Sequence, residues 1–130
     1  MTPRGFFAAA FAVAGVFFYA FSSLADVIAV IGTGRMGAAV GQRLSEQGHK
    51  VIYGSRTPMS ERVQELVIET GPGTIATTNA DAIAKGTIIA LALPFSATEA
   101  LIKNNGGNLD KKIILDITNA PLKALSPDRE

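Results

Sequence analysis

The sequence predicts an α/β fold, a doubly wound parallel sheet with helices on both faces. Three observations support this fold class. Short apolar segments rich in β-branched residues alternate with helix-like segments, the first apolar segment runs straight into a glycine-rich turn, and no repeat or low-complexity linker divides the 130 residues. We expect about five strands in the order 3-2-1-4-5, because parallel strands are joined by right-handed crossovers.

The chain is organised around residues 27–37, in which the apolar run Val-Ile-Ala-Val-Ile precedes Gly32, Gly34 and Gly37. A buried strand, a tight turn and a helix start in the pattern G-x-G-x-x-G are typical of a dinucleotide site. Gly32 permits the sharp turn, Gly34 lets the backbone approach a pyrophosphate, and Gly37 lets the helix pack closely on the strand. The pattern alone is weak evidence, because glycine is common in turns.

The other elements follow the same alternation. Strands are predicted at 50–53, 74–76, 87–93 and 112–117, and helices at 36–47, 58–70 and 96–103, with a further short helix that begins at Asn79. We expect Thr57 to cap the second of these helices, with Pro58 in its first turn. Ser96 and Glu99 are expected to form a capping box at the start of the last helix. The glycine turn and the segments after the second and fourth strands then meet at the carboxyl edge of the sheet.

The end of the second strand indicates which dinucleotide the chain binds. NAD-selective domains carry an acid about 20 residues after the glycine turn, where it binds the ribose 2′-hydroxyl. This chain has Gly54, Ser55 and Arg56 there, with no acid. Arg56 can pair with a 2′-phosphate through charge-assisted hydrogen bonds, with Ser55 and Thr57 as hydroxyl donors. We therefore predict NADP as the cofactor.

Composition excludes several other functions. Hydrophobic residues make up 48% and charged residues 18% of the chain, as in globular proteins. A net charge of +1 gives no electrostatic case for a nucleic-acid partner. The chain has no cysteine, which excludes disulfides and thiolate catalysis. With His49 as the single histidine, no metal site is predicted.

The first 25 residues form a separate apolar segment, uncharged from residue 5 to residue 25 and preceded by Arg4. We expect an apolar helix directed to a membrane, and two interpretations stay open. One is a secretory signal peptide cleaved before Asp26. The other is an uncleaved anchor that spans a bilayer. The chain is then membrane-anchored or exported, with the side of the membrane open, and divides into residues 1–25, an NADP-binding domain at 26–121 and a tail at 122–130.

Four motifs in order carry a family resemblance: the glycine turn at 32–37, Tyr-Gly-Ser-Arg at 53–56, Ala-Leu-Pro-Phe at 92–95 and Asp-Ile-Thr-Asn at 116–119. With them the chain resembles the N-terminal Rossmann domain of NADP oxidoreductases that depend on the deazaflavin coenzyme factor 420. It is also similar to the corresponding domains of pyrroline-5-carboxylate reductase, of 6-phosphogluconate dehydrogenase relatives and of six-transmembrane metalloreductases. The resemblance covers roughly Asp26 to Pro121.

The resemblance implies cofactor contacts along the carboxyl edge of the sheet. The residues implied at the pyrophosphate and ribose are Thr33, Gly34, Arg35 and Met36. Ser55 and Arg56 would hold the 2′-phosphate. The residues implied towards the nicotinamide are Leu93, Pro94 and Asn119.

Two functions from different classes follow. The first is an oxidoreductase that transfers hydride between NADPH and a flavin-like, deazaflavin-like or small imine or carbonyl acceptor. The alternative is a non-catalytic NADP-binding module, membrane-tethered or exported, derived from the family by truncation. Family enzymes continue into a further region that completes the acceptor pocket and often the dimer, so a homodimer or a partner subunit would complete the site here. No residue is predicted as a catalytic acid or base: we expect His49 at the far end of the sheet and Asp116 to accept a structural hydrogen bond.

Overall fold

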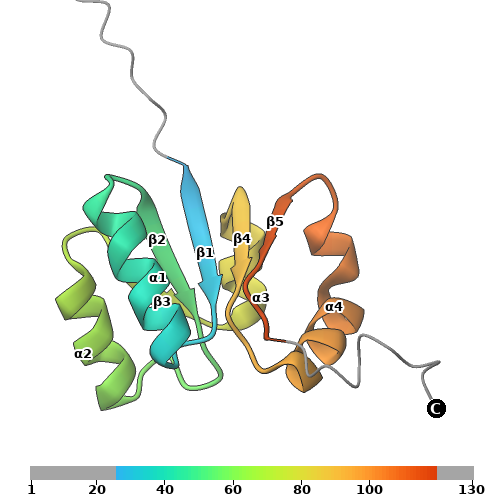
Figure 1. The fold of residues 1–130 in the computed structure, drawn as a ribbon, viewed down its shortest axis with the longest axis horizontal. Helices are drawn as coiled ribbons and strands as arrows, with labels where there is room; N and C mark the ends of the chain where they lie inside the picture. The colour runs from blue at the N-terminus through green and yellow to red at the C-terminus, as the bar shows by residue number, and fades with distance from the viewer. Residues whose placement is uncertain (1–25, 120–130) are drawn as a thin grey trace, which may run out of the picture.

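The computed structural model describes residues 26–119, which form a five-stranded parallel sheet flanked by helices (Figure 1). The strand order is β3-β2-β1-β4-β5, so the predicted fold class and topology are confirmed. The strands are β1 (Val27–Ile31), β2 (Lys50–Gly54), β3 (Ile75–Thr77), β4 (Ile88–Leu91) and β5 (Ile113–Asp116). The helices are α1 (Arg35–Glu46), α2 (Glu61–Thr70), α3 (Asn79–Lys85) and α4 (Phe95–Leu109).

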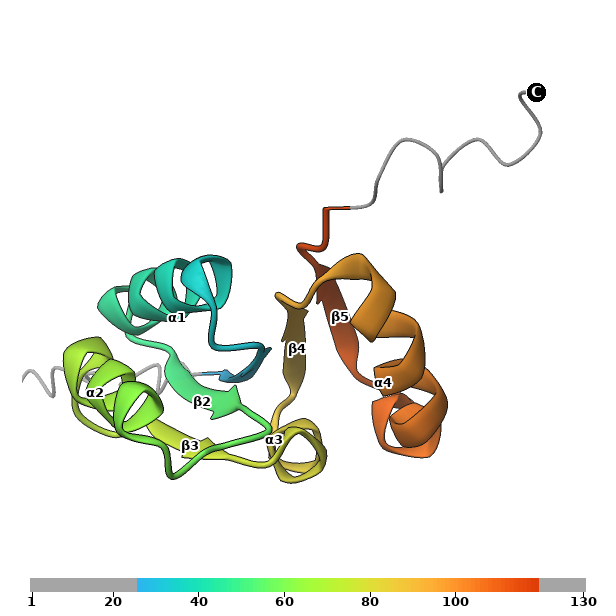
Figure 2. The ribbon, with the colours of Figure 1, turned by 90° about the horizontal axis from the view of Figure 1, so that it is seen from below.

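The helices lie on both faces of the sheet. Figure 2 shows α1 and α2 on one face and α3 on the other, and α4 packs beside α3. Because successive side chains of a strand point to opposite faces, β1 supplies both layers of the core. Ile28 and Val30 pack with the α1–α2 layer, whereas Ala29 and Ile31 pack with the α3–α4 layer. This two-sided burial explains why the strand is a continuous apolar run.

The glycine turn after β1 has the conformation that the sequence predicts. Gly32 has a φ of 112°, which favours glycine, and a Cβ there would lie 2.5 Å from the carbonyl oxygen of Ala92. Its N–H donates to the carbonyl of Gly54 at 3.1 Å, which ties the turn to the end of β2. A Cβ on Gly37 would collide with the carbonyl of Gly32. The first turn of α1 therefore packs directly on the loop.

The start of α2 differs from the prediction. Thr57 does not cap this helix, and Pro58 does not lie in it, because α2 begins at Glu61 with Ser60 as its N-cap. The N–H of Thr57 donates instead to Oγ of Ser55 at 3.1 Å, which closes a side-chain turn just after β2. That local hydrogen bond competes with helix formation and moves the helix start along the chain.

The last helix also differs. The capping box predicted at Ser96 is wrong, because α4 begins at Phe95 with Pro94 as its N-cap and no side-chain cap. The helix continues to Leu109, well beyond the predicted end at residue 103. Leu109 packs against the core on the α3 side, so tertiary contact offsets the poor helix propensity of the asparagines and glycines before it.

β5 is tied to α3 at its beginning. The amine of Lys112 donates to the carbonyl oxygens of Ile83, Ala84 and Gly86 at the end of α3, at 3.1 Å for Ala84 and 2.8 Å for Gly86. A lysine at a helix C-terminus also complements the partial negative charge of the unpaired carbonyls there.

The ends of the chain lie outside the described residues. Within residues 26–119, no helix is long and apolar enough to span a lipid bilayer. The predicted leader or anchor at 1–25 and the tail at 122–130 are not described, so they and the predicted location stay predictions.

Candidate dinucleotide site

A cleft of about 1140 Å³ opens at the carboxyl edge of the sheet, between the loops that follow β1, β2 and β4. Small-molecule sites enclose roughly 300–1,000 Å³, so this cleft has room for a dinucleotide. The predicted site residues that line it are Gly32, Thr33, Gly34, Ser55, Arg56, Thr57, Leu93 and Pro94. The structure thus brings together three segments that are far apart in the sequence.

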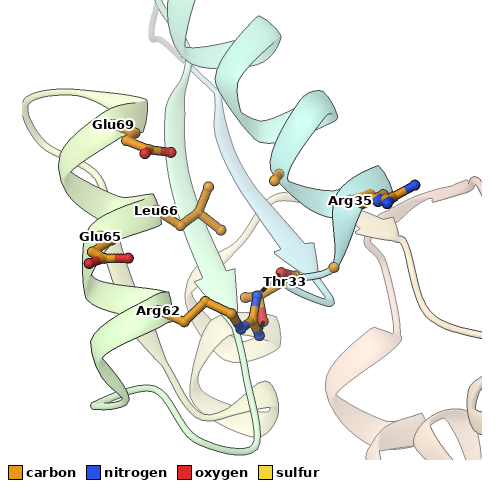
Figure 3. Close-up of a pocket in the computed structure, with 8 residues that line it drawn as sticks. Thr33, Arg35, Arg62, Glu65, Leu66 and Glu69 are labelled. Carbon is orange, nitrogen blue, oxygen red and sulfur yellow. Dashed lines mark hydrogen bonds between the residues drawn. The ribbon is translucent and has the colours of Figure 1, made fainter.

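The other predicted site residues lie outside this cleft. Arg35 lines a smaller hollow of about 260 Å³ between α1 and α2, and Figure 3 shows its side chain extending away from α2. Met36 is 51% exposed, Gly37 is buried beneath the turn, and Asn119 is exposed after the end of β5. None of these three residues lines either cavity.

The N-terminus of α1 faces the glycine turn with unsatisfied donors. Gly34 is its N-cap and provides no side-chain hydrogen bond, and the first turn of α1 contains no acidic residue. The first N–H groups of a helix have no partner inside the helix, and they carry partial positive charge. A Cβ built on Gly34 meets nothing within 4 Å, so open space lies beside these donors. This arrangement suits a phosphate group.

The loop after β2 is ordered by hydrogen bonds. Ser55 is buried, and its N–H donates to the carbonyl of Thr77 at 2.9 Å. Its Oγ accepts from the N–H of Thr57, while Arg56 between them is exposed and lines the cleft. The backbone around Arg56 is therefore fixed, and its guanidinium is accessible to a ligand.

Arg62, in the first turn of α2, also lies at this site and was not predicted from the sequence. Its Nη1 donates to the carbonyl oxygen of Thr33 at 2.7 Å, and its Nη2 donates to Oγ1 of the same residue at 3.2 Å (Figure 3). Arg62 lines both the hollow and the cleft. The sequence does show a second arginine shortly after Arg56. Its contact with Thr33, however, joins residues 29 positions apart, and no local sequence pattern indicates such a contact.

The charged residues that line the cleft are all basic. Of the described residues that line it, the charged ones are Arg56 and Arg62, and none is acidic. Within residues 26–119 the ion pairs are Arg43 with Glu46 at 2.9 Å and Lys103 with Glu99 at 3.2 Å, so neither cleft arginine has an acidic partner there. Two unpaired guanidinium groups make this part of the cleft suitable for an anion.

No catalytic acid or base lines the described part of the cleft. Asp116 acts as a structural acceptor, as expected: its Oδ1 accepts from the N–H of Thr118 at 2.8 Å. Hydrogen bonding by Thr118, through its side chain and then its backbone, lowers the pKa of Asp116. His49 precedes β2, at the opposite end of the sheet. Within residues 26–119, no group of three or more His, Asp or Glu side chains could hold a metal ion.

Comparison with protein families matches residues 27–120 to the family described as NADP oxidoreductase coenzyme F420-dependent. No curated protein matches the chain significantly. Among solved structures, the chain is 28% identical to a protein described as an F420-dependent NADP reductase from Arthrobacter sp. FB24, with a TM-score of 0.65 over 72% of this chain and 45% of that one.

Two further structures share the fold. An imine reductase from Bacillus cereus BAG3X2 is 25% identical, with a TM-score of 0.61 over 72% of this chain and 32% of that one. A reductive aminase from Aspergillus terreus, solved in complex with NADPH4, cyclohexanone and allyl amine, is 27% identical, with a TM-score of 0.60 over 81% and 38%. The chain therefore spans less than half the length of each of these three proteins.

Proposed function

The chain belongs to the family of NADP oxidoreductases that depend on coenzyme F420, and on that premise we propose that it binds NADP(H) for hydride transfer. The acceptor in this proposal is a flavin-like or deazaflavin-like ring, or a small imine or carbonyl compound. In this proposal a homodimer or a partner subunit contributes to the acceptor site.

The observation that carries the proposal is the charge of the cleft. Arg56 stands at the end of β2, where an NAD-selective domain places an acid, and the described lining residues include no acid at all. A carboxylate there would repel a 2′-phosphate, whereas a guanidinium binds it. The complex of the Aspergillus terreus enzyme with NADPH4 supports the same class of cofactor.

The proposed pose follows from the polar groups of the cleft. The pyrophosphate lies against the N-terminus of α1, where Gly34 leaves space for it. The residues that complete the pyrophosphate and ribose contacts are Thr33, Arg35 and Met36. The 2′-phosphate lies at Ser55, Arg56 and Thr57. The residues proposed nearer the nicotinamide are Leu93, Pro94 and Asn119.

The cofactor supplies a hydride from its reduced nicotinamide ring, and this chain binds and orients it. Such a transfer to a flavin-like ring depends mainly on stacking and orientation, so it does not need an acid or base in the cleft. A transfer to an imine or a carbonyl also needs a proton, which solvent or the completed acceptor site would supply.

A non-catalytic NADP-binding module is the second candidate. The observation that favours it is the edge of the sheet beyond β4, where all four residues of β5 are exposed. A pocket for an acceptor is not enclosed there by the described residues. Turnover by the chain decides between the two candidates.

The cofactor is tested with Arg56→Ala in the full chain. We expect NADPH binding to weaken by about 1.5–3 kcal/mol, the range for a hydrogen bond to a charged group, and NADH binding to stay nearly unchanged. Fluorescence titration with both cofactors measures the change. Arg43→Ala is the matched control, because Arg43 is exposed and pairs with Glu46 away from the cleft. A parallel loss for both cofactors would remove the role of Arg56 in selecting NADP.

Turnover is tested by following NADPH oxidation with flavin, deazaflavin, quinone and cyclic imine acceptors. Oxidation with any of them supports the oxidoreductase. Tight NADPH binding with no oxidation supports the binding module.

We also propose that residues 1–25 direct the chain to a membrane, as a cleaved leader or as an anchor. The mass of the mature protein tests this proposal, because a chain that begins at Asp26 has lost a leader. A chain that begins at Met1 and stays in the aqueous fraction after lysis would contradict both forms of the proposal.

A further inference from the structure

Arg62 crosses from α2 to the loop after β1. Its two terminal nitrogens donate to the carbonyl oxygen and to Oγ1 of Thr33, at 2.7 Å and 3.2 Å (Figure 3). Two hydrogen bonds to one residue fix the plane of the guanidinium group. The remaining N–H groups of Arg62 keep their capacity to donate. The side chain is thus held in place at the wall of the cleft.

The charge of Arg62 is not neutralised by its neighbours. Glu65 and Glu69 follow it on α2, and all three residues line the smaller hollow. Figure 3 shows both carboxylates farther along the helix, away from the guanidinium, and within residues 26–119 Arg62 forms no ion pair. Thr33 offers two neutral acceptors, which orient the guanidinium without cancelling its charge.

Arg62 also shares the cleft with Arg56, and an ordered turn connects the two. The N–H of Ser60 donates to the carbonyl of Thr57 at 3.1 Å, and Nε2 of Gln64 donates to the carbonyl of Pro58 at 2.8 Å. These bonds fix the path between Arg56 and the first turn of α2. Both arginines line the same cleft.

We propose that Arg62 is a second residue that determines cofactor specificity, and that it binds the 2′-phosphate of NADP together with Arg56 while Thr33 holds it in position. This inference rests on the proposed function, which requires an NADP site in this cleft. A phosphate monoester carries about −1.5 to −2 charges at pH 7, so one guanidinium leaves part of its charge uncompensated. Arg62 compensates the remaining negative charge of the 2′-phosphate.

The test uses adenosine 2′,5′-bisphosphate and ADP, which differ in the position of one phosphate, and measures binding to the full chain by calorimetry. We expect Arg62→Ala to weaken the 2′,5′-bisphosphate by about 10- to 100-fold and ADP by less than about threefold, because the lost hydrogen bonds go to a charged group present in only the first ligand. Arg62→Lys restores part of the affinity, since it keeps the charge but not the forked geometry. Arg43→Ala, on the exposed side of α1, should leave both affinities unchanged.

Phosphorus NMR of the bound 2′,5′-bisphosphate separates direct binding from a structural role. The second ionisation of a phosphate monoester has a pKa of about 6, and each cation close to it lowers that value. Arg62→Ala should raise the pKa of the bound 2′-phosphate. A residue that only supported the loop would leave it unchanged.

Arg62→Gln keeps the protein testable if Arg62→Ala does not fold, because the amide can still donate to Thr33 but carries no charge. An equal loss for the two ligands, or no loss for either, would overturn the inference. If Arg56→Ala removes the preference for the 2′,5′-bisphosphate but Arg62→Gln does not, the proposed function stands and the role of Arg62 fails. If the wild-type chain shows no preference, both fail.

Discussion

The half of the sheet that contains β1 and β2, here called the enclosed side, is more completely buried by the described residues than the edge at β5, here called the open side. In β1 and β2, four of the five residues of each strand are buried. In β5 all four residues are exposed, with Ile113 at 66% and Leu115 at 47%. The enclosed side carries the glycine turn and the two arginines of the cleft. The open side is where the nicotinamide and its acceptor would lie in the proposed pose.

The two ends of the proposed site therefore depend on different parts of the fold. The phosphate end depends on the first β–α–β unit, the start of α2 and β3, because Gly32, Ser55 and Arg62 are held by contacts within these elements. The open side has no comparable layer over β5 among residues 26–119. We infer that binding of the phosphate end and completion of the acceptor end are separable properties.

The largest effect is expected from truncating one buried and one exposed isoleucine, which tests whether the two halves of the sheet differ in burial. Ile52 in β2 is 3% exposed and Ile113 in β5 is 66% exposed. We expect Ile52→Ala to lower the free energy of unfolding by about 2–5 kcal/mol, because it leaves a cavity in the core. Ile113→Ala should cost about 0.5 kcal/mol or less, as surface substitutions do. Urea denaturation of both variants of the full chain measures the difference, and equal losses would show that β5 is covered in solution.

A smaller effect is expected at Tyr53, in the buried layer under α2. Thr70 Oγ1 donates to the carbonyl of Leu66 at 2.7 Å, so in its 2.9 Å bond with Tyr53 the phenol is the donor. Tyr53→Phe leaves the Thr70 oxygen without that donor. The variant should lose about 0.5–1.5 kcal/mol of unfolding free energy near pH 8, measured by denaturation.

The loss at Tyr53 should depend on pH in a defined direction. Burial raises the pKa of Tyr53 above its ordinary value of 10.0, although the hydrogen bond with Thr70 acts the other way. The unfolded chain therefore ionises first, and the contribution of Tyr53 is full below about pH 10 and declines as the pH rises further. The difference between the wild type and Tyr53→Phe should shrink between pH 8 and pH 10.5. A constant difference would mean that folding does not raise the pKa of Tyr53.

Most of the fold could be predicted because it depends on local patterns. The apolar runs of β1 and β4 indicate buried parallel strands, and the spacing of Gly32, Gly34 and Gly37 identifies the turn. The strand order follows from crossover handedness. The position of Ser55 and Arg56 at the cleft could also be predicted, because both residues lie directly after a predicted strand.

The features that could not be predicted from the sequence depend on side-chain contacts outside any local pattern. Arg62 contacts Thr33 across 29 residues, and no local period marks that pair. α2 begins later than predicted because Oγ of Ser55 accepts a hydrogen bond from the N–H of Thr57. This local hydrogen bond competes with the predicted role of Thr57 as the helix cap. α4 extends to Leu109 because that leucine packs on the core, against the propensity of the residues before it. Each of these depends on tertiary context.

In the proposed function, the enclosed side of the sheet forms a phosphate-binding site selective for NADP. Titration of the wild-type full chain with NADPH and with NADH tests it most directly, because the two cofactors differ only in the 2′-phosphate. We predict that NADPH binds at least about tenfold more tightly, since one or more charge-assisted hydrogen bonds are made to that group alone. Equal affinity for the two cofactors would show that the site does not select NADP.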